Sequence, residues 1–397
     1  KLFILMFTTL LITTSVLAQE EQWDDWDEEE SVNGVTINGF GQLKLGNFLD
    51  TAPSQRSIAV KDALWRLESD YQHEYYQLAL KADIGYDLLD SSWFKKIREL
   101  SLALDFSNIN HSMINDTPLN NVAFVIGRQS LSWGLGDFVF INDLFSKDWQ
   151  AFFNGQDDQY LKKPTDAFKV SYYGQFLSVD IVYQPTFVGD NLIGTSPMLQ
   201  NKPTPQDDSL NGRIYFSNNQ TDYAIYASDG WATQPKQFAT NVDYAAQKSL
   251  GASLITPLND GLFKVEIGKY WQTSVSTQHK HQQSRWLIGY EFELMPRVNI
   301  AMQAYAERDN KKLINSNRQL ITTRLTHQSL NSLWNNQLMM FYSPNHHDRY
   351  IRASTTYRHN DQISLTAGLN SISGNTTTFF GSLSSQENIY IRLTFFY

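Results

Sequence analysis

The chain has 397 residues, of which 42% are hydrophobic and 14% aromatic; its formal net charge is −9 and it contains no cysteine. It is long enough to bury a large core or to close a large sheet, and its mean hydropathy of −0.39 argues against a bundle of membrane helices. The lack of cysteine excludes a disulfide framework, a thiolate metal site, a cysteine nucleophile and a lipid-anchored cysteine.

Residues 1–18 have the pattern of a secretory signal peptide. An apolar run over 2–17 follows Lys1, and Ser15-Val16-Leu17-Ala18 provides small residues before a cleavage site at Gln19. A membrane anchor helix is the alternative, but the run is short and acidic rather than basic residues follow it. We therefore predict that the protein is exported.

Residues 19–34 are predicted to be an acidic segment on the periplasmic side. They contain eight carboxylates and two tryptophans, Trp23 and Trp26. Blocks of like charge are normally disordered and solvated, which favours a solubilising leader. The alternative is a docking segment for a periplasmic partner, or a mobile plug.

From Val35 onward, apolar and polar residues alternate with a period of two, which is the pattern of half-buried strands. Segments of about ten residues with one apolar and one charged face are typical of transmembrane β-barrels. A soluble sandwich has shorter strands that meet in one core, and a β-helix or propeller would show an internal repeat, which is absent. The sequence therefore predicts an all-β fold, a transmembrane antiparallel barrel over 35–397.

The connections support the barrel and give the number of strands. Short turns, such as those at His73-Glu74, Asn218-Asn219 and Met295-Pro296, alternate with longer polar loops such as 131–165 and 229–246. Bacterial outer-membrane barrels have short turns on one side and long loops on the other, and an even number of strands. We predict about 18 strands, with 16 as the alternative.

The last segment points to the outer membrane. Residues 388–397 read NIYIRLTFFY, with apolar residues on one face and Arg392 and Thr394 on the other. This segment resembles the C-terminal insertion signal of Gram-negative outer-membrane proteins. The resemblance implies a barrel surrounded by the lipid of a Gram-negative outer membrane.

Chemistry in such a barrel comes from the residues that face the lumen. Alternation assigns one face of each strand to the lumen, and the cost of charges on the lipid face supports this assignment. The predicted basic wall consists of Arg66, Arg318, Arg324, Arg352, Arg358 and Arg392, and the predicted acidic lining consists of Glu266, Glu291, Glu293 and Glu307. Separated walls would select solutes by charge. Alternatively, these charges neutralise one another across neighbouring strands.

The loop 131–165 is too long for an ordinary connection and too aromatic to be disordered. Its notable residues are Trp133, Asp137, Asp143, Asp148, Trp149, Asp157 and Asp158. It is the third long loop, and it resembles the third external loop of general porins, which folds into the barrel and narrows the channel. That resemblance implies that the carboxylates line a constriction opposite the arginines. A cap packed at the rim is the alternative.

A second resemblance concerns the start of this loop. Gly127-Arg128-Gln129-Ser130-Leu131-Ser132-Trp133-Gly134 is similar to the GRQ-x-x-x-WG segment of alginate-export and related porin-like barrels. The match is short, and it implies a porin-like barrel without indicating a substrate.

The sequence does not indicate an enzyme, a cofactor or a resident metal. His346-His347-Asp348 is predicted to lie in a long loop as exposed polar residues, and His279-Lys280-His281 lies in another loop. The oxygen-rich segment 154–158 lacks the ligand spacing of an EF-hand. No GxSxG motif, phosphate-binding glycine motif or basic stripe for nucleic acid is present.

The sequence thus predicts a non-enzymatic outer-membrane porin. It would pass small polar or anionic solutes by passive diffusion, through a lumen narrowed by the loop 131–165. The alternative is a structural or docking barrel that sheathes a partner or exports a polymer.

Overall fold

The computed structural model describes residues 34–49, 57–105, 118–193, 204–238, 241–310, 317–329 and 331–397. The predicted signal peptide (1–18) and all of the acidic segment except Gly34 lie outside these ranges.

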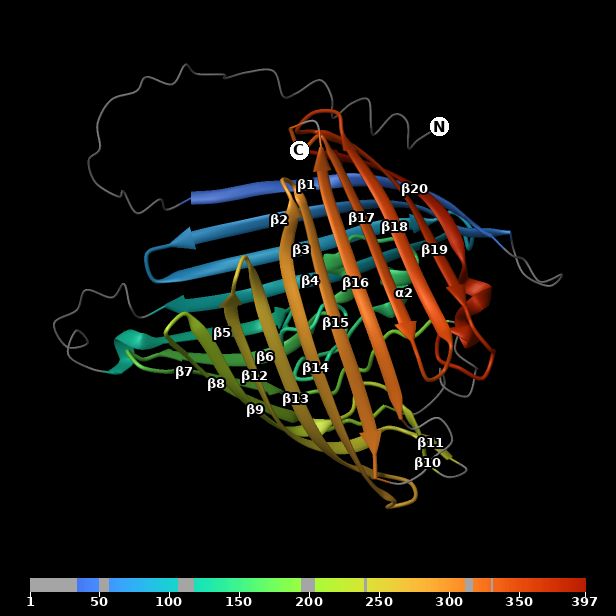
Figure 1. The fold of residues 1–397 in the computed structure, drawn as a ribbon. Helices are drawn as coiled ribbons and strands as arrows, with labels where there is room; N and C mark the ends of the chain where they lie inside the picture. Colours follow the sequence, from blue (N-terminus) through green and yellow to red (C-terminus); the bar gives the residue numbers. More distant parts are fainter. Residues whose placement is uncertain are drawn as a thin grey trace. The chain divides into compact units, whose positions relative to one another are not determined.

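The described residues form one closed antiparallel barrel of 18 strands (Figure 1). The barrel strands are β1 (Gly34–Phe48), β2 (Ile58–His73), β3 (Tyr76–Asp87), β4 (Ser92–Asp105), β5 (Val122–Gln129), β6 (Thr165–Tyr173), β7 (Ser178–Gln184), β8 (Ser209–Asn218), β9 (Thr221–Trp231), β12 (Ala245–Leu258), β13 (Gly261–Ser274), β14 (Lys280–Met295), β15 (Val298–Asp309), β16 (Arg318–Ser329), β17 (Trp334–Ser343), β18 (Asp348–Arg358), β19 (Ile363–Ser373) and β20 (Asn388–Phe396). Each strand pairs with the next, and β1 closes the ring against β20, from Phe40↔Phe396 to Phe48↔Asn388. The predicted fold and strand number are confirmed.

The connections differ at the two ends of the barrel. At one end, tight turns join β2 to β3, β8 to β9 and β14 to β15, and we call this the short-turn end. The opposite, long-loop end carries the segment between β5 and β6 and the segment between β9 and β12, which contains a small hairpin of β10 (Lys236–Phe238) and β11 (Asn241–Asp243). The prediction of a long loop at 343–348 is wrong, because β17 and β18 are joined there by a four-residue turn over 344–347.

The outer face of the barrel is apolar, as a lipid-facing surface must be. Leu250, Ile267, Ile288 and Ile391 are 53%, 45%, 55% and 55% exposed. Because the strands alternate, the residues between these positions face the lumen, and many are polar. Among the described residues, none of the helices has the length and apolar character needed to span a bilayer. The helices of the described residues are all short: η1 (Pro118–Asn121), α2 (Trp149–Phe153), η2 (Asp158–Leu161) and η3 (Gly381–Gln386).

Candidate functional site

The segment between β5 and β6, residues 130–164, lies inside the barrel. Its polar contacts reach inward side chains on strands from around the whole ring: β1, β2, β4, β13, β14, β15, β16, β18, β19 and β20. A cap at the rim could not touch the lumen side of so many strands. We call residues 130–164 the lumen loop.

An aromatic cluster holds the lumen loop together and fixes it to the wall. Phe152 and Phe153, on the single turn of α2, are 2% and 3% exposed and pack with Tyr350 of β18. Asp148 caps α2 by accepting a hydrogen bond from the Ala151 amide, and Trp149 donates its indole hydrogen to Asp190. The aromatic side chains that argued against a disordered loop therefore form the packed core of the lumen loop inside the barrel.

The first arm of the lumen loop, residues 133–142, has two of its amides bound by one carboxylate. Glu266 on β13 is fully buried and accepts hydrogen bonds from the amides of Leu135 (3.0 Å) and Asn142 (2.8 Å). Gly134 has φ +81°, and a Cβ there would lie 2.7 Å from the Glu266 Oε1. Glu266 does not line open water as predicted, because loop amides without a partner in a sheet ladder occupy it.

The second arm, residues 155–162, is bound by guanidinium groups. Arg352 of β18 donates to the Asp158 carboxylate (2.6 Å) and to the Gln156 carbonyl (3.1 Å), and Arg392 of β20 donates to the Gly155 carbonyl (3.3 Å). Arg352 is only 5% exposed, whereas Asp158 is 38% exposed. This carboxylate thus lies at the border between the docked arm and the open lumen.

Two further arginines hold the end of the second arm. Arg98 of β4 donates to the carbonyls of Lys162 (2.8 Å) and Gln159 (3.3 Å), and Arg66 of β2 donates to the Gln159 side chain (3.3 Å). Their guanidinium carbons lie 4.5 and 4.6 Å from the ring centre of Tyr160. Burial raises the pKa of Tyr160, so the ring remains a neutral partner for both cations.

The sequence prediction did not include Arg98, and a β-bulge explains why. Lys81 pairs with Glu99 and the next residue, Ala82, pairs with Ile97, so Arg98 is the extra residue in β4. Strict alternation with Leu100 would place Arg98 on the lipid face. The bulge turns it into the lumen, where it is 6% exposed.

Facing the first arm, a compact ion cluster brings the predicted basic and acidic residues together. Arg324 of β16 lies 3.0 Å from Asp137 and 3.5 Å from Glu291, and Lys264 lies 2.8 Å from Glu291. Arg324, Asp137 and Glu291 are each between 23% and 30% exposed. The separation into a basic and an acidic wall is absent here, because β14 and β16 flank a single neighbour and their long side chains meet.

The other predicted lining residues lie at the two ends of the barrel. Arg358 and Glu293 are exposed near the short-turn end, and Glu293 accepts a hydrogen bond from the Arg297 amide in a turn. Glu307 and Arg318 lie at the long-loop end, where Tyr305 donates to Glu307 (2.6 Å). Arg358 and Glu293 therefore lie away from the docked arms of the lumen loop, whereas Glu307 and Arg318 line a cavity that the first arm also borders.

The remaining loop carboxylates serve the loop itself. Asp143 is buried, accepts from Lys147 Nζ (2.8 Å) and Ser132 (3.0 Å), and has a pKa raised by burial against the lowering effect of Lys147. Asp157 caps η2 through the Gln159 amide and is exposed. Trp133 packs edge-on against Phe145 and lies under the Arg213 guanidinium, on the inner face of β8.

A cavity of about 390 Å³ opens on the long-loop side of the lumen loop. Its wall includes aromatic rings and both signs of charge: Phe138, Phe140, Trp149, Tyr305, Phe379, Phe380, Lys147, Arg285, Arg318, Asp190 and Glu307. The Arg318 guanidinium lies 4.2 Å from the Phe379 ring centre and 4.8 Å from that of Phe380. Within the described part of the chain, its Nε and Nη2 are buried without a hydrogen-bond partner.

The Gly127–Gly134 segment has a structural role. Gly127 has φ +118°, and a Cβ would lie 2.3 Å from the Leu100 carbonyl. Arg128 forms a two-point ion pair with Asp166 across β5 and β6, and Gln129 donates to the Ala167 carbonyl (3.2 Å). These contacts fix the two strand ends from which the lumen loop begins and returns.

The histidine-containing segments are divided by the fold. Asp348 is buried at the start of β18 and accepts from the Phe380 amide (2.7 Å), whereas His346 lines the cavity. His281 faces the lumen and pairs with Asp309 (2.9 Å), and the adjacent Lys280 lies on the opposite face. Over the residues that the structure describes, no group of three or more His, Asp or Glu is arranged to hold a metal ion.

No family model and no curated protein matches this chain. Among solved structures it is similar to OccAB2 of Acinetobacter baumannii, with 9% identity, a TM-score of 0.59, and coverage of 93% of this chain and 99% of that one. It is also similar to OccK2 (OpdF) of Pseudomonas aeruginosa in complex with glucuronate, with 10% identity, a TM-score of 0.56, and coverage of 91% and 97%. It is similar as well to OccAB3 of A. baumannii, with 9% identity, a TM-score of 0.55, and coverage of 91% of this chain and 99% of that one.

The chain therefore has the fold of a Gram-negative outer-membrane porin. This fold and the apolar outer face confirm the predicted transmembrane β-barrel and the predicted location in the outer membrane.

Proposed function

We propose that the barrel is a passive channel for small polar solutes, that residues 131–165 narrow its passage, and that it favours solutes with negative charge. The partly exposed groups Arg324 and Arg392, with Asp137 and Asp158, would border the passage. Arg66, Arg352 and Glu266 would act by holding the lumen loop in place.

One observation carries the preference for anions: Arg318, at the long-loop entrance, has buried guanidinium nitrogens without a partner among the residues that the structure describes. A solute carboxylate would supply the missing acceptors through charge-assisted hydrogen bonds. The rings of Phe379 and Phe380 would flank the same solute. The glucuronate held by the similar barrel OccK2 is a sugar carboxylate, and it makes a suitable probe for this site.

Planar-bilayer recording tests this function. We expect stepwise conductance and a reversal potential on the anion side in a KCl gradient. Replacing residues 137–160 with a short Gly-Ser linker should increase the conductance, because the linker removes most of both docked arms. Arg318→Gln should reduce anion preference and weaken current block by glucuronate. Arg349→Gln is the matched control, because it removes the same charge from the outer face.

If neither the complete chain nor the loop-replaced form conducts, the porin function is wrong and the sheathing barrel becomes the better proposal. If both conduct and Arg318→Gln leaves the reversal potential and the block unchanged, the channel stands and the role of Arg318 is wrong.

A further inference from the structure

The outer face of the barrel carries charges at one end only. Residues directly opposite each other on paired strands share a face, so the register against exposed Leu, Ile and Trp residues identifies the outward set. The outward charged residues of the strands are Lys61, Lys95, Arg128, Asp166, Asp229, Lys248, Lys269, Lys280, Arg308 and Arg349. All lie near the long-loop end. In the described strands, the outward positions of the short-turn half carry no Lys, Arg, Asp or Glu.

The two acidic members of this set are already paired. Asp166 is bound to Arg128 (2.8 Å) and Asp229 to Lys248 (2.9 Å). The long-loop end of the outer face therefore has an excess of positive charge.

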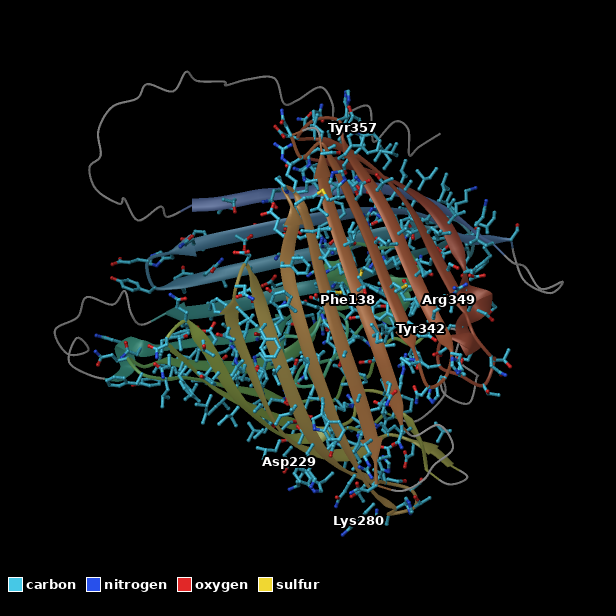
Figure 2. All side chains as sticks on the ribbon, in the orientation of Figure 1. Phe138, Asp229, Lys280, Tyr342, Arg349 and Tyr357 are labelled. Carbon is cyan, nitrogen blue, oxygen red and sulfur yellow. The ribbon has the colours of Figure 1, made fainter. Side chains whose placement is uncertain are left out.

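Three of the cations that have no ion-pair partner in the described part of the chain gather on adjacent strands. Lys269 of β13, Ser284 of β14 and Arg308 of β15 lie opposite one another in a single row. Neighbouring strands are about 4.8 Å apart, so the backbones at Lys269 and Arg308 are about 10 Å apart. Lys280 lies on the same face of β14, four residues closer to the rim, or about 13 Å. We call Lys269, Lys280 and Arg308 the basic patch; Figure 2 labels Lys280 at this end and Tyr357 at the other.

The basic patch lies at the depth of lipid headgroups. Lys269 extends over the Trp271 ring (5.3 Å), and Trp271 and Trp286 are 38% and 42% exposed on the same face. Tryptophan and tyrosine form belts at the interface of the bilayer, and the apolar Ile267 and Ile288 continue below them. All three cations are exposed, and the structure gives none of them an ion-pair partner among the described residues.

We propose that the basic patch is a binding site for a lipid of the leaflet on the long-loop side, recognised through phosphate esters on its headgroup. Long loops of outer-membrane barrels face the outside, so the lipid is an outer-leaflet glycolipid. The patch offers three cations to the phosphates and two tryptophans to the sugar and upper acyl region. Basic residues close to a membrane surface each contribute about 1 kcal/mol to binding of anionic lipid.

Native mass spectrometry of the detergent-purified barrel tests this site. The probe is bisphosphorylated lipid A, compared with the same lipid after removal of both phosphates. The triple variant Lys269→Gln, Lys280→Gln, Arg308→Gln should bind the phosphorylated probe about 100-fold more weakly at low salt, since three contacts of about fivefold each are lost. The charge-conserving variant Lys269→Arg, Lys280→Arg, Arg308→Lys should retain binding.

The matched control is Lys61→Gln, Lys95→Gln, Arg349→Gln, which removes three outward cations from separated strands of the same end. An equal loss in this control would show a diffuse charge effect and overturn the patch. Equal binding of the dephosphorylated probe by the wild-type protein would overturn phosphate recognition. Unchanged binding by the triple Gln variant would overturn the site itself. Channel conductance tests the proposed function separately, because the patch lies on the outer face.

Discussion

The two arms of the lumen loop differ in the chemistry of their main anchors. The first arm offers amide hydrogens, and the buried Glu266 carboxylate accepts two of them. The second arm offers carbonyl oxygens, and Arg98, Arg352 and Arg392 donate to them. A chain inside a barrel has no ladder partner for its backbone, so inward wall residues have to satisfy it. Some of the charged side chains in the lumen therefore serve to hold the loop in place.

Two amides of the first arm share one buried acceptor, Glu266, and Gln303, Arg285, Tyr270 and Arg324 add single contacts to this arm. The second arm takes its donors from several arginines, none of which accounts for all of its contacts. Removal of Glu266 leaves two buried donors unpaired, at about 1–3 kcal/mol each. Loss of a single arginine leaves the second arm with its other donors. This difference sets the order of the effects expected below.

The largest effect is expected for Glu266→Ala. Residues 133–142 should detach from the β13 wall, and the conductance should become larger and noisier. A spin label at Ser132 should report increased motion in electron paramagnetic resonance spectra. Glu266→Gln is the control, because its amide oxygen can still accept one of the two hydrogen bonds and should give an intermediate spectrum. An immobile label in Glu266→Ala would contradict the assignment of Glu266 as the anchor.

A smaller effect is expected for the pair Arg352→Gln, Arg392→Gln. Residues 155–158 lose three hydrogen bonds, while Arg98 and Arg66 still hold Gln159 and Lys162. The conductance should rise by less than in Glu266→Ala, and the reversal potential should move toward cations because Asp158 is released. The double Lys variant, which keeps both charges, should preserve the selectivity. A rise in conductance larger than that of Glu266→Ala would show that the arginines, and not Glu266, are the more important anchors of the loop.

The smallest effect is a pH dependence on the side of the first arm. Lys236 donates to Gln272 (3.0 Å) and Gln283 (3.3 Å), and burial followed by the nearby Arg285 charge lowers its pKa from 10.5 to about 8. The ammonium is charged below that value and neutral above it, so anion preference should fall as the pH rises through about 8. Reversal potentials from pH 6.5 to 9.5 would measure this change.

The same shift has a consequence for the β10–β11 hairpin. The folded state binds the Lys236 proton less tightly than the unfolded chain does, so the contribution of Lys236 to stability is present above its usual pKa and is lost as the pH falls through about 8.

Lys236→Gln should remove the pH dependence of the reversal potential. If the dependence persists in that variant, another group is responsible.

The fold was predictable because lipid imposes a strict alternation on every strand. The number of 18 strands follows from the alternating turns and loops. The placement of the site residues was only partly predictable. Arg98 was not predicted to face the lumen, because a bulge breaks the alternation of β4. Glu266 was predicted to line the open lumen, because periodicity does not show which inward side chains a loop will cover.

The histidine segment shows the same limit on a smaller scale. His346, His347 and Asp348 are adjacent in the chain, and the sequence favoured a long polar loop there. The chain turns within 344–347, with φ +54° at His347, and Asp348 becomes a buried acceptor for the Phe380 amide. The partner of Asp348 comes from a segment 32 residues away, which local pattern does not reveal.

The pairing of β1 with β20 constrains the order in which this molecule assembles. Arg392 and Tyr390, which contact Gly155 of the lumen loop, belong to the strand that closes the ring. Both ends of the loop, however, are fixed earlier in the chain, on the adjacent strands β5 and β6. The loop can thus settle on the curved sheet of β1–β6 while the ring is open. If the ring closes after that, the later strands meet the loop in the lumen, and no segment has to thread through a finished pore.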